Sequence, residues 1–211
     1  MPMTTVRPNT SPIYCFIKRM FDILSSAVML ILLSPIFLII IIAIKIDDPG
    51  PAFFVQQRNG LNGKIFKMFK FRSMYQNAPE LHSGLGELNE MEGPVFKIKE
   101  DPRITRVGYF LRRSSIDELP QLLNILLGDM SVVGPRPLPD YESVNLSENH
   151  KQRMLVRPGL LCYWQVRGRT RIPFDEWMEL DLKYINEADL WVDFKIILEG
   201  IPAVLTGDGA E

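Results

Sequence analysis

The chain has 211 residues, with 24 lysines and arginines against 25 aspartates and glutamates, so its formal net charge is −1. This balance excludes the global positive field that is typical of nucleic-acid-binding domains. With only two cysteines and two histidines, the composition gives no basis for a disulfide framework or a histidine-based metal centre. The length suits one domain with an appendage.

The charged residues are nevertheless unevenly distributed. Between Asp48 and Glu80, and again between Glu148 and Asp175, every charged residue is basic. Two local cationic segments in a neutral chain indicate a small anionic ligand or a membrane surface. A pair of ordinary solvated faces would show the same pattern.

Residues 1–12 contain prolines and small polar residues and predict a loose N-terminal tail. Residues 21–44 are apolar apart from Asp22 at their edge, and a hydrocarbon core takes about 20 such residues. Pro35 in the middle of this run predicts a kink, which the Ser34 hydroxyl could relieve by bonding to the carbonyl of Leu30 or Ile31. We therefore expect a membrane element over residues 13–48 and a globular domain over residues 49–211.

Basic residues flank this apolar run on both sides, with Lys18 and Arg19 before it and Lys45 after it. A helix that crosses the bilayer should carry its excess of positive charge on one side only. The sequence thus favours a broken, re-entrant helix that enters and leaves by the same face. A plain kinked transmembrane helix is the alternative, and the residues alone leave both open.

The segment that follows predicts a β-hairpin. Residues 53–57 and 65–71 have strand character, and Asn59-Gly60 and Asn62-Gly63 supply turn residues between them. Side chains two residues apart on a strand lie on one face, so Lys70 and Arg72 should lie together. Beyond the hairpin, residues 76–94 predict a helix and a loop, and residues 95–99 a short strand.

Three further helices are expected. One spans Ser115–Leu127, with Gly128 as its C-terminal cap. Two amphipathic helices cover residues 174–184 and 190–201, and Pro202 should end or bend the second. Their tryptophans suit either a membrane interface or a packed core. Before them, a strand-like run should follow the Pro158-Gly159 turn.

Asp117 and Glu118 stand side by side where the first of these helices should begin. A capping box, with Ser115 as N-cap and Glu118 at the third position, accounts for them structurally. Adjacent helical residues point about 100° apart, which excludes the facing carboxylates of a glycosidase. They could instead divide the work, with one acid as nucleophile and the other as ligand of Mg²⁺. Nearby arginines, including Arg112, Arg136, Arg157 and Arg169, suit bidentate phosphate contacts.

Several separate blocks resemble one family. The segments KFRSM (70–74), 101–139, RPGL (157–160), WQVRGR (164–169) and VLTGDGA (204–210) resemble the bacterial sugar transferases, the monotopic polyprenyl-phosphate phosphoglycosyl transferases. The blocks occur in the family's order from Cys15 to the C-terminus. The resemblance implies a mainly helical α+β fold in a monotopic membrane protein. Its expected parts are a re-entrant helix broken at Ser34-Pro35, a small β-hairpin or sheet, and interfacial amphipathic helices.

The resemblance also implies a reaction. Asp117 would attack the sugar-bearing phosphate of a UDP-sugar and release UMP, and polyprenyl (undecaprenyl) phosphate would then accept the phosphosugar. Glu118 would assist, and with Asp117 it would bind Mg²⁺. Substrate-binding residues would be Lys70, Arg72, Arg112, Arg136, Arg157, Gln165 and Arg169. The expected setting is the bacterial inner membrane, with the catalytic domain (49–211) on the cytoplasmic face and contacts to membrane lipid. No nucleic acid is expected, and a homodimer is left open.

Two departures leave the sugar undetermined: Leu161-Cys162-Tyr163 and Arg167 differ from the residues frequent in the family. The chain is expected to be a minimal catalytic unit without the additional domains of larger members. Two other functions compete with the transferase. A membrane-bound Mg²⁺-dependent phosphatase or pyrophosphatase would use the same aspartate with water as acceptor. A non-catalytic scaffold would bind anionic lipid through the basic segments.

Overall fold

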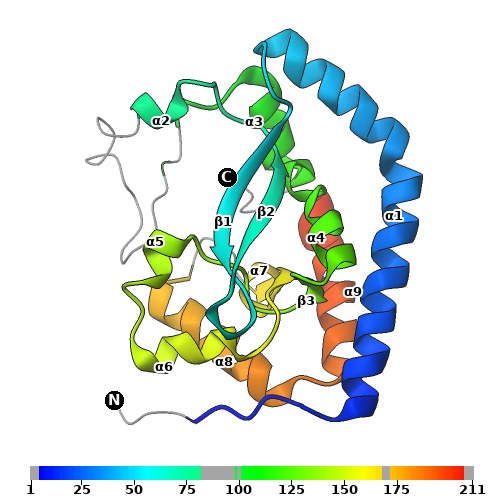
Figure 1. The fold of residues 1–211 in the computed structure, drawn as a ribbon, viewed down its shortest axis with the longest axis vertical. Helices are drawn as coiled ribbons and strands as arrows, with labels where there is room; N and C mark the ends of the chain where they lie inside the picture. The colour runs from blue at the N-terminus through cyan, green and yellow to red at the C-terminus, as the bar shows by residue number, and fades with distance from the viewer. Residues whose placement is uncertain (1–4, 82–97, 99–100, 168–171, 207–211) are drawn as a thin grey trace.

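A computed structural model describes residues 5–81, 98, 101–167 and 172–206 (Figure 1). The fold is mainly helical, with two small sheets. In chain order the elements are α1 (Pro12–Asp47), β1 (Phe53–Asn59), η1 (Leu61–Gly63), β2 (Ile65–Phe71), α2 (Ala78–Leu81), α3 (Arg106–Arg113), η4 (Ile116–Glu118), α4 (Gln121–Leu127), β3 (Ser131–Val133), α5 (Asp140–Ser143), α6 (Glu148–Lys151), η5 (Gln152–Leu155), β4 (Gly159–Leu161), α7 (Tyr163–Arg167), α8 (Phe174–Glu187) and α9 (Leu190–Thr206).

Helix α1 runs along one side of the molecule and bends in its second half (Figure 1). Pro35 lies inside it without interrupting the helix, so the break expected at Ser34-Pro35 is not present. The Ser34 hydroxyl donates to the Ile31 carbonyl at 2.8 Å, as the sequence suggested. Within the described residues, α1 is the one helix long and apolar enough to cross a membrane. Only 11% of its most apolar 18-residue window is buried in the protein. A core helix of a soluble protein would be mostly buried, so α1 offers its outer face to an apolar environment.

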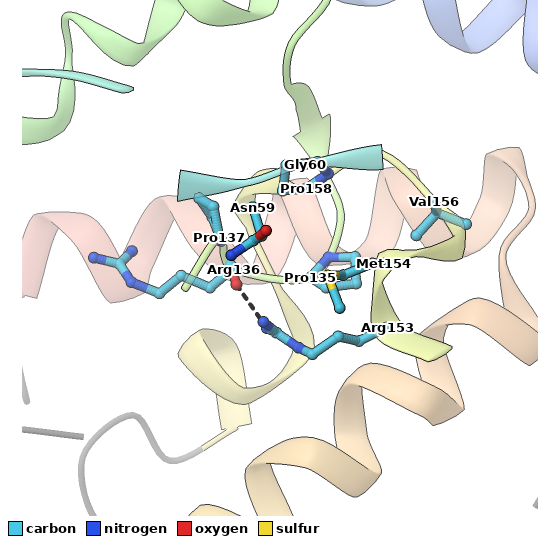
Figure 2. Close-up of a pocket in the computed structure, with 9 residues that line it drawn as sticks. All are labelled: Asn59, Gly60, Pro135, Arg136, Pro137, Arg153, Met154, Val156 and Pro158. Carbon is cyan, nitrogen blue, oxygen red and sulfur yellow. Dashed lines mark hydrogen bonds between the residues drawn. The ribbon is translucent and has the colours of Figure 1, made fainter. Parts of the chain in front are cut away.

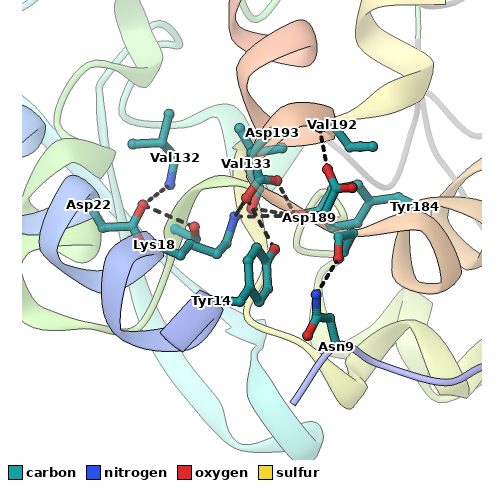
Figure 3. Close-up of polar contacts among 12 residues, drawn as sticks. Asn9, Tyr14, Lys18, Asp22, Val132, Val133, Tyr184, Asp189, Val192 and Asp193 are labelled. Atoms are coloured by element: carbon teal, nitrogen blue, oxygen red, sulfur yellow. Dashed lines mark hydrogen bonds and ion pairs between the residues drawn. The ribbon is translucent and has the colours of Figure 1, made fainter. Parts of the chain in front are cut away.

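The N-terminal half of α1 is bound to the globular body through three charged side chains. Lys18 pairs with Asp193 of α9 at 2.7 Å, and Arg19 donates to the carbonyls of the last turn of α4, at 2.7 and 2.8 Å. Asp22 accepts from the Ser131 hydroxyl at 3.0 Å and the Val132 amide at 2.8 Å (Figure 3). Sequence reasoning treated the basic residues before the apolar run, Lys18 and Arg19, only as signals of membrane topology. In the structure they also bind the globular body.

We predict that Asp22→Ala destabilises the protein. Asp22 is 2% exposed, and its loss leaves the Ser131 hydroxyl and the Val132 amide without their acceptor, at a cost of about 1–3 kcal/mol. Thermal unfolding in detergent or nanodiscs should show a lower midpoint. Asp22→Asn keeps one acceptor oxygen and is the matched control, with a smaller effect. An alanine variant as stable as the wild type would contradict this role.

The C-terminal end of α1 contacts the same body. Asp47 accepts from the Val107 amide at the start of α3 at 2.8 Å, and Ile40 and Ile44 pack in one cluster with Phe71 and Leu111. Both ends of a 36-residue helix are therefore held by one globular unit.

The β1–β2 hairpin is confirmed. The strands pair antiparallel from Phe53 opposite Phe71 to Asn59 opposite Ile65, and Asn62 takes the left-handed conformation that the Asn-Gly turn signal predicts, with φ 55°. Asn124 of α4 fastens the hairpin, since its side chain accepts from the Phe69 amide at 3.0 Å and donates to the Lys67 carbonyl at 2.7 Å. This contact fixes the end of β2 that carries Lys70 against α4.

The second sheet pairs β3 with β4 in parallel. The strand-like run after Gly159 is confirmed for Gly159–Leu161 alone, and β3 was not predicted. The start of β4 lies close to the backbone just after β3, since a Cβ on Gly159 would lie 2.0 Å from the Gly134 nitrogen. Glycine is required there because the backbones approach too closely for any side chain.

Other expectations need correction. The predicted loose tail is wrong for residues 5–11, because Val6 is buried and its amide donates to Gln152 Oε1 at 3.0 Å; residues 1–4 lie outside the described part of the chain. Helix α9 continues to Thr206, so Pro202 does not end it. Of the segment 76–94 the structure describes residues 76–81, including α2. The strand predicted over 95–99 lies outside the described residues except Ile98, which is not in a strand.

The two C-terminal helices differ in their surroundings. Helix α8 is a core helix, since Trp177, Leu182 and Tyr184 are buried, and the interfacial alternative does not apply to it. Helix α9 buries Ile196 but exposes other large apolar side chains: Leu190, Trp191, Phe194 and Leu198. This outward apolar face suits a membrane interface.

Candidate active site

The acidic pair lies in a sharp turn between two helices. Helix α3 ends at Arg113, and Ser115 takes the left-handed conformation, with φ 56° and ψ 15°. Ile116–Glu118 then form a single 3-10 turn, and α4 begins after Pro120. The predicted continuous helix over Ser115–Leu127 is therefore wrong. So is the capping box, because the Ser115 side chain makes no capping hydrogen bond and the Glu118 carboxylate faces two cations.

Two cationic side chains, Lys70 and Arg136, hold Glu118 in its ionised form. Its Oε1 accepts from Lys70 Nζ at 2.8 Å. Arg136 binds it with both arms of the guanidinium, Nη1 to Oε2 at 3.0 Å and Nη2 to Oε1. Burial by itself would raise the pKa of Glu118, but Arg136 and Lys70 outweigh burial and hold that pKa well below its ordinary range. The indole ring of Trp164 lies beside the same guanidinium, with its centroid 6.0 Å from Arg136 Cζ.

Asp117 has a different environment. It is 8% exposed, and the Lys70 ammonium lies 4.0 Å from its Oδ2, beyond hydrogen-bond distance. Burial raises the pKa of Asp117 to about 6; Lys70 opposes this rise and the neighbouring Glu118 adds to it. Lys70 is therefore a loose ion-pair partner of Asp117, and the Asp117 oxygens accept no hydrogen bond from the described residues. Of two adjacent acids, one is fixed in an ion-pair network and the other is available to react.

Four of the residues singled out from sequence come together: Asp117, Glu118, Lys70 and Arg136. Their elements are η4, the end of β2 and the segment after β3. Arg112, on the last turn of α3, lies within electrostatic reach of Asp117 and lowers its pKa.

Other predicted substrate-binding residues lie elsewhere or have other partners. Arg72 lies one residue beyond the end of β2 and pairs with Asp48 at 3.2 Å. Arg157 is exposed and donates to the Gly128 carbonyl at 3.0 Å, and Gln165 Oε1 accepts from the Cys162 amide at 3.1 Å. Arg169 lies outside the described residues. Sequence reasoning assigned no role to Arg58 or Arg153, which donate to the carbonyls of Pro137 and Arg136, respectively.

The acidic residues of the site fit Mg²⁺ only as an ion that substrate phosphates also bind. Among the residues that the structure describes, no group of three or more acidic, histidine or cysteine side chains could hold a metal ion alone. Mg²⁺ commonly keeps several waters and takes one or two carboxylates together with substrate phosphates. A carboxylate has about four lone-pair positions, and Glu118 uses three of them on Lys70 and Arg136. One position on Oε2 and the Asp117 oxygens therefore fit an ion that arrives with a diphosphate.

Known proteins are similar to this chain over most of its length. The chain is 44% identical over 197 residues to the galactosyl transferase CpsE of Streptococcus agalactiae, covering 92% of this chain but 43% of that protein. It is 39% identical over 203 residues to the exopolysaccharide production protein ExoY of Rhizobium meliloti, covering 94% of this chain and 90% of ExoY. It is 40% identical over 204 residues to the UDP-glucose:undecaprenyl-phosphate glucose-1-phosphate transferase of Caulobacter vibrioides, covering 92% and 71%.

The chain thus spans less than half the length of CpsE, and the region shared with these relatives includes the whole described site. The family described as "Bacterial sugar transferase" matches residues 13–207, which hold α1, the hairpin, the acidic pair and Arg136. The sequence resemblance is confirmed: the chain belongs to the bacterial sugar transferase family.

Proposed function

We propose that this protein transfers a sugar-1-phosphate from a UDP-sugar to undecaprenyl phosphate and releases UMP, as the first membrane step in building a bacterial glycan. The observation that carries the proposal is the separation of roles within the acidic pair. The Asp117 carboxylate accepts no hydrogen bond from the described residues and lies 4.0 Å from Lys70, whereas Glu118 beside it is held by Lys70 and Arg136. The name of the Caulobacter relative describes the same class of reaction.

In the first step an Asp117 oxygen attacks the phosphorus that bears the sugar. The bond from this phosphorus to the oxygen of the uridine-linked phosphate breaks, and UMP leaves with the electron pair. In the second step a phosphate oxygen of the lipid attacks the same phosphorus, and the bond to Asp117 breaks, which restores the carboxylate. Two displacements through a covalent aspartyl-phosphosugar split one difficult transfer into two easier ones.

The cations of the site meet the main obstacle to this chemistry, which is repulsion between a carboxylate and a diphosphate. Lys70 lies between Asp117 and Glu118 and would neutralise charge on the transferred phosphoryl group, with Arg112 acting from α3. Glu118 and Asp117 would hold Mg²⁺, which when bound supplies positive charge to the phosphate oxygens. The lipid phosphate is already largely ionised and needs little general-base help.

We also propose that α1 is re-entrant and that the globular domain lies on the cytoplasmic face of the inner membrane. A 36-residue helix is about 54 Å long, against a hydrocarbon core of about 30 Å. Because both ends of α1 contact one body, a simple crossing would force that body through the bilayer.

Thiol labelling tests this placement. The native Cys15 is exposed near the start of α1, and Asn145→Cys adds a thiol at an exposed position of the globular domain. A membrane-impermeant reagent should label both in inverted vesicles and neither in spheroplasts. Labelling of the two cysteines from opposite sides would exclude the re-entrant arrangement.

The function is tested by UMP release from a panel of UDP-sugars, with undecaprenyl phosphate and Mg²⁺ present. One sugar should support multiple turnovers that require the lipid. Repeated turnover without lipid would indicate the phosphatase or pyrophosphatase alternative, and no release with any sugar would favour the lipid-binding scaffold. The panel is necessary because the relatives' names specify different sugars.

A further inference from the structure

Arg136 lies in a backbone segment in which every carbonyl oxygen accepts a hydrogen bond. Residues 135–138 have four successive carbonyl oxygens, and each accepts a hydrogen bond from a different residue. The donors, in order along the segment, are Gly159 N at 2.9 Å, Arg153 Nη2 at 2.6 Å, Arg58 Nη1 at 2.9 Å and Asn59 N at 3.2 Å.

The composition of the segment explains why it depends on these donors. Pro135 and Pro137 flank Arg136 and have no backbone N–H of their own. Of residues 135–138 only Arg136 and Leu138 have a backbone N–H, so the position of the segment depends mainly on what its carbonyls accept. Two of the four donors are arginine side chains, which act on the carbonyls of Arg136 and Pro137 themselves.

Arg153 is held in turn by Asp181 of α8. Its Nε donates to Asp181 Oδ2 at 2.9 Å, and its Nη2 donates to the same oxygen and to the Arg136 carbonyl. Arg153 is 5% exposed and Asp181 1%. Figure 2 shows the Arg153 guanidinium reaching the Arg136 carbonyl, while the Arg136 side chain extends away from it. A buried ion pair is weak evidence for stability, because its desolvation offsets its attraction, so its geometry is the more informative feature.

We propose that Arg153 and Asp181 are positioning residues that aim Arg136 at Glu118. The inference rests on the proposed function, in which the Lys70–Glu118–Arg136 network supports Asp117. Neither residue contacts the acidic pair: the Arg153 guanidinium is engaged by Asp181 and by the Arg136 carbonyl. Arg58 holds the next carbonyl from the hairpin side, so the peptide after Arg136 is fixed from two directions. Loss of the Arg153 contact would let this peptide rotate and shift the guanidinium relative to Glu118.

A double-mutant cycle on kcat/KM for UMP release tests the proposal. Arg153→Lys keeps the charge, but a lysine ammonium lacks the planar guanidinium that donates to both Asp181 and the Arg136 carbonyl. It should lower kcat/KM about tenfold or more, since small misplacements near a reacting centre cost this much. In an Arg136→Ala background the same change should cost nothing further, because a residue that acts only through Arg136 has nothing left to position. Asp181→Asn should behave in the same way.

Lys183→Ala is the matched control. Lys183 is also on α8, in an exposed pair with Glu187, and its loss should leave activity unchanged in both backgrounds. Equal losses from Arg153→Lys in the wild-type and Arg136→Ala backgrounds, or no loss in either, would overturn the positioning role. If Arg153→Lys does not fold, Asp181→Asn decides by the same comparison. An Arg136→Ala enzyme as active as the wild type would instead refute the proposed role of Arg136 in the site.

Discussion

The Asp117→Asn protein should fold normally and release no UMP above background, a loss on the order of 10³-fold or more. The substitution is nearly isosteric and replaces the attacking carboxylate with an amide that is not nucleophilic. Under the scaffold alternative the same change would be harmless. Asp129→Asn makes an identical change at a half-buried aspartate just beyond α4 and should retain full activity.

The Asp117→Asn substitution, which should abolish activity, should not lower the stability of the protein and could raise it. Burial raises the pKa of Asp117 from 3.8 to about 6, so the folded protein holds this proton more tightly than the unfolded chain does. Such a group costs stability as the pH rises from about 4 to about 6, and the cost persists at higher pH. At pH 8 the asparagine variant should therefore unfold at the same temperature as the wild type or higher. An inactive variant that is also clearly less stable would point to a structural role for Asp117.

The Glu118→Gln protein should lose activity on the order of 10²-fold and need more Mg²⁺ for half-maximal rate. An amide offers one acceptor oxygen in place of two and has no charge. Lys70 and Arg136 then lose the carboxylate that both contact. Removing one partner of such a buried pair leaves the other charge uncompensated, so a lower unfolding midpoint is also expected.

Rates measured across a Mg²⁺ titration separate the two possible roles of Glu118. Glu148→Gln is the control, since it removes the carboxylate from an exposed pair with Lys151 and should change neither rate nor Mg²⁺ requirement. A Glu118→Gln enzyme with reduced activity but the wild-type Mg²⁺ requirement would eliminate the metal role. Its role in holding Lys70 and Arg136 would be unaffected by that result.

The elements that sequence predicted well have strong local signals. The hairpin follows from the alternation in residues 65–71 and from turn residues such as Asn62, which takes the left-handed conformation. The sequence also predicted the long apolar helix α1. The family resemblance predicted that Lys70, Arg136 and the acidic pair would lie together.

The failures have physical causes. Ser115 is neither glycine nor asparagine, so nothing in the sequence marks the left-handed turn that breaks the predicted helix. Strand β3 has three residues, which is too short for a periodic pattern. Arg72 was predicted to lie beside Lys70 at the site, but it follows the end of β2 and pairs with Asp48 just after α1. Arg58 and Arg153 bind backbone carbonyls. Every residue has a carbonyl, so residue types do not show which one an arginine will bind.

Intact-protein mass spectrometry without the lipid acceptor should show whether Asp117 carries the phosphosugar. With the preferred UDP-sugar and Mg²⁺, the enzyme should release at most one UMP per active site and gain the mass of one sugar phosphate. Peptide mapping should place that mass on Asp117, and later addition of undecaprenyl phosphate should remove it. UMP release that requires the lipid from the first turnover, with no mass gained by the enzyme, would exclude a covalent aspartyl-phosphosugar intermediate.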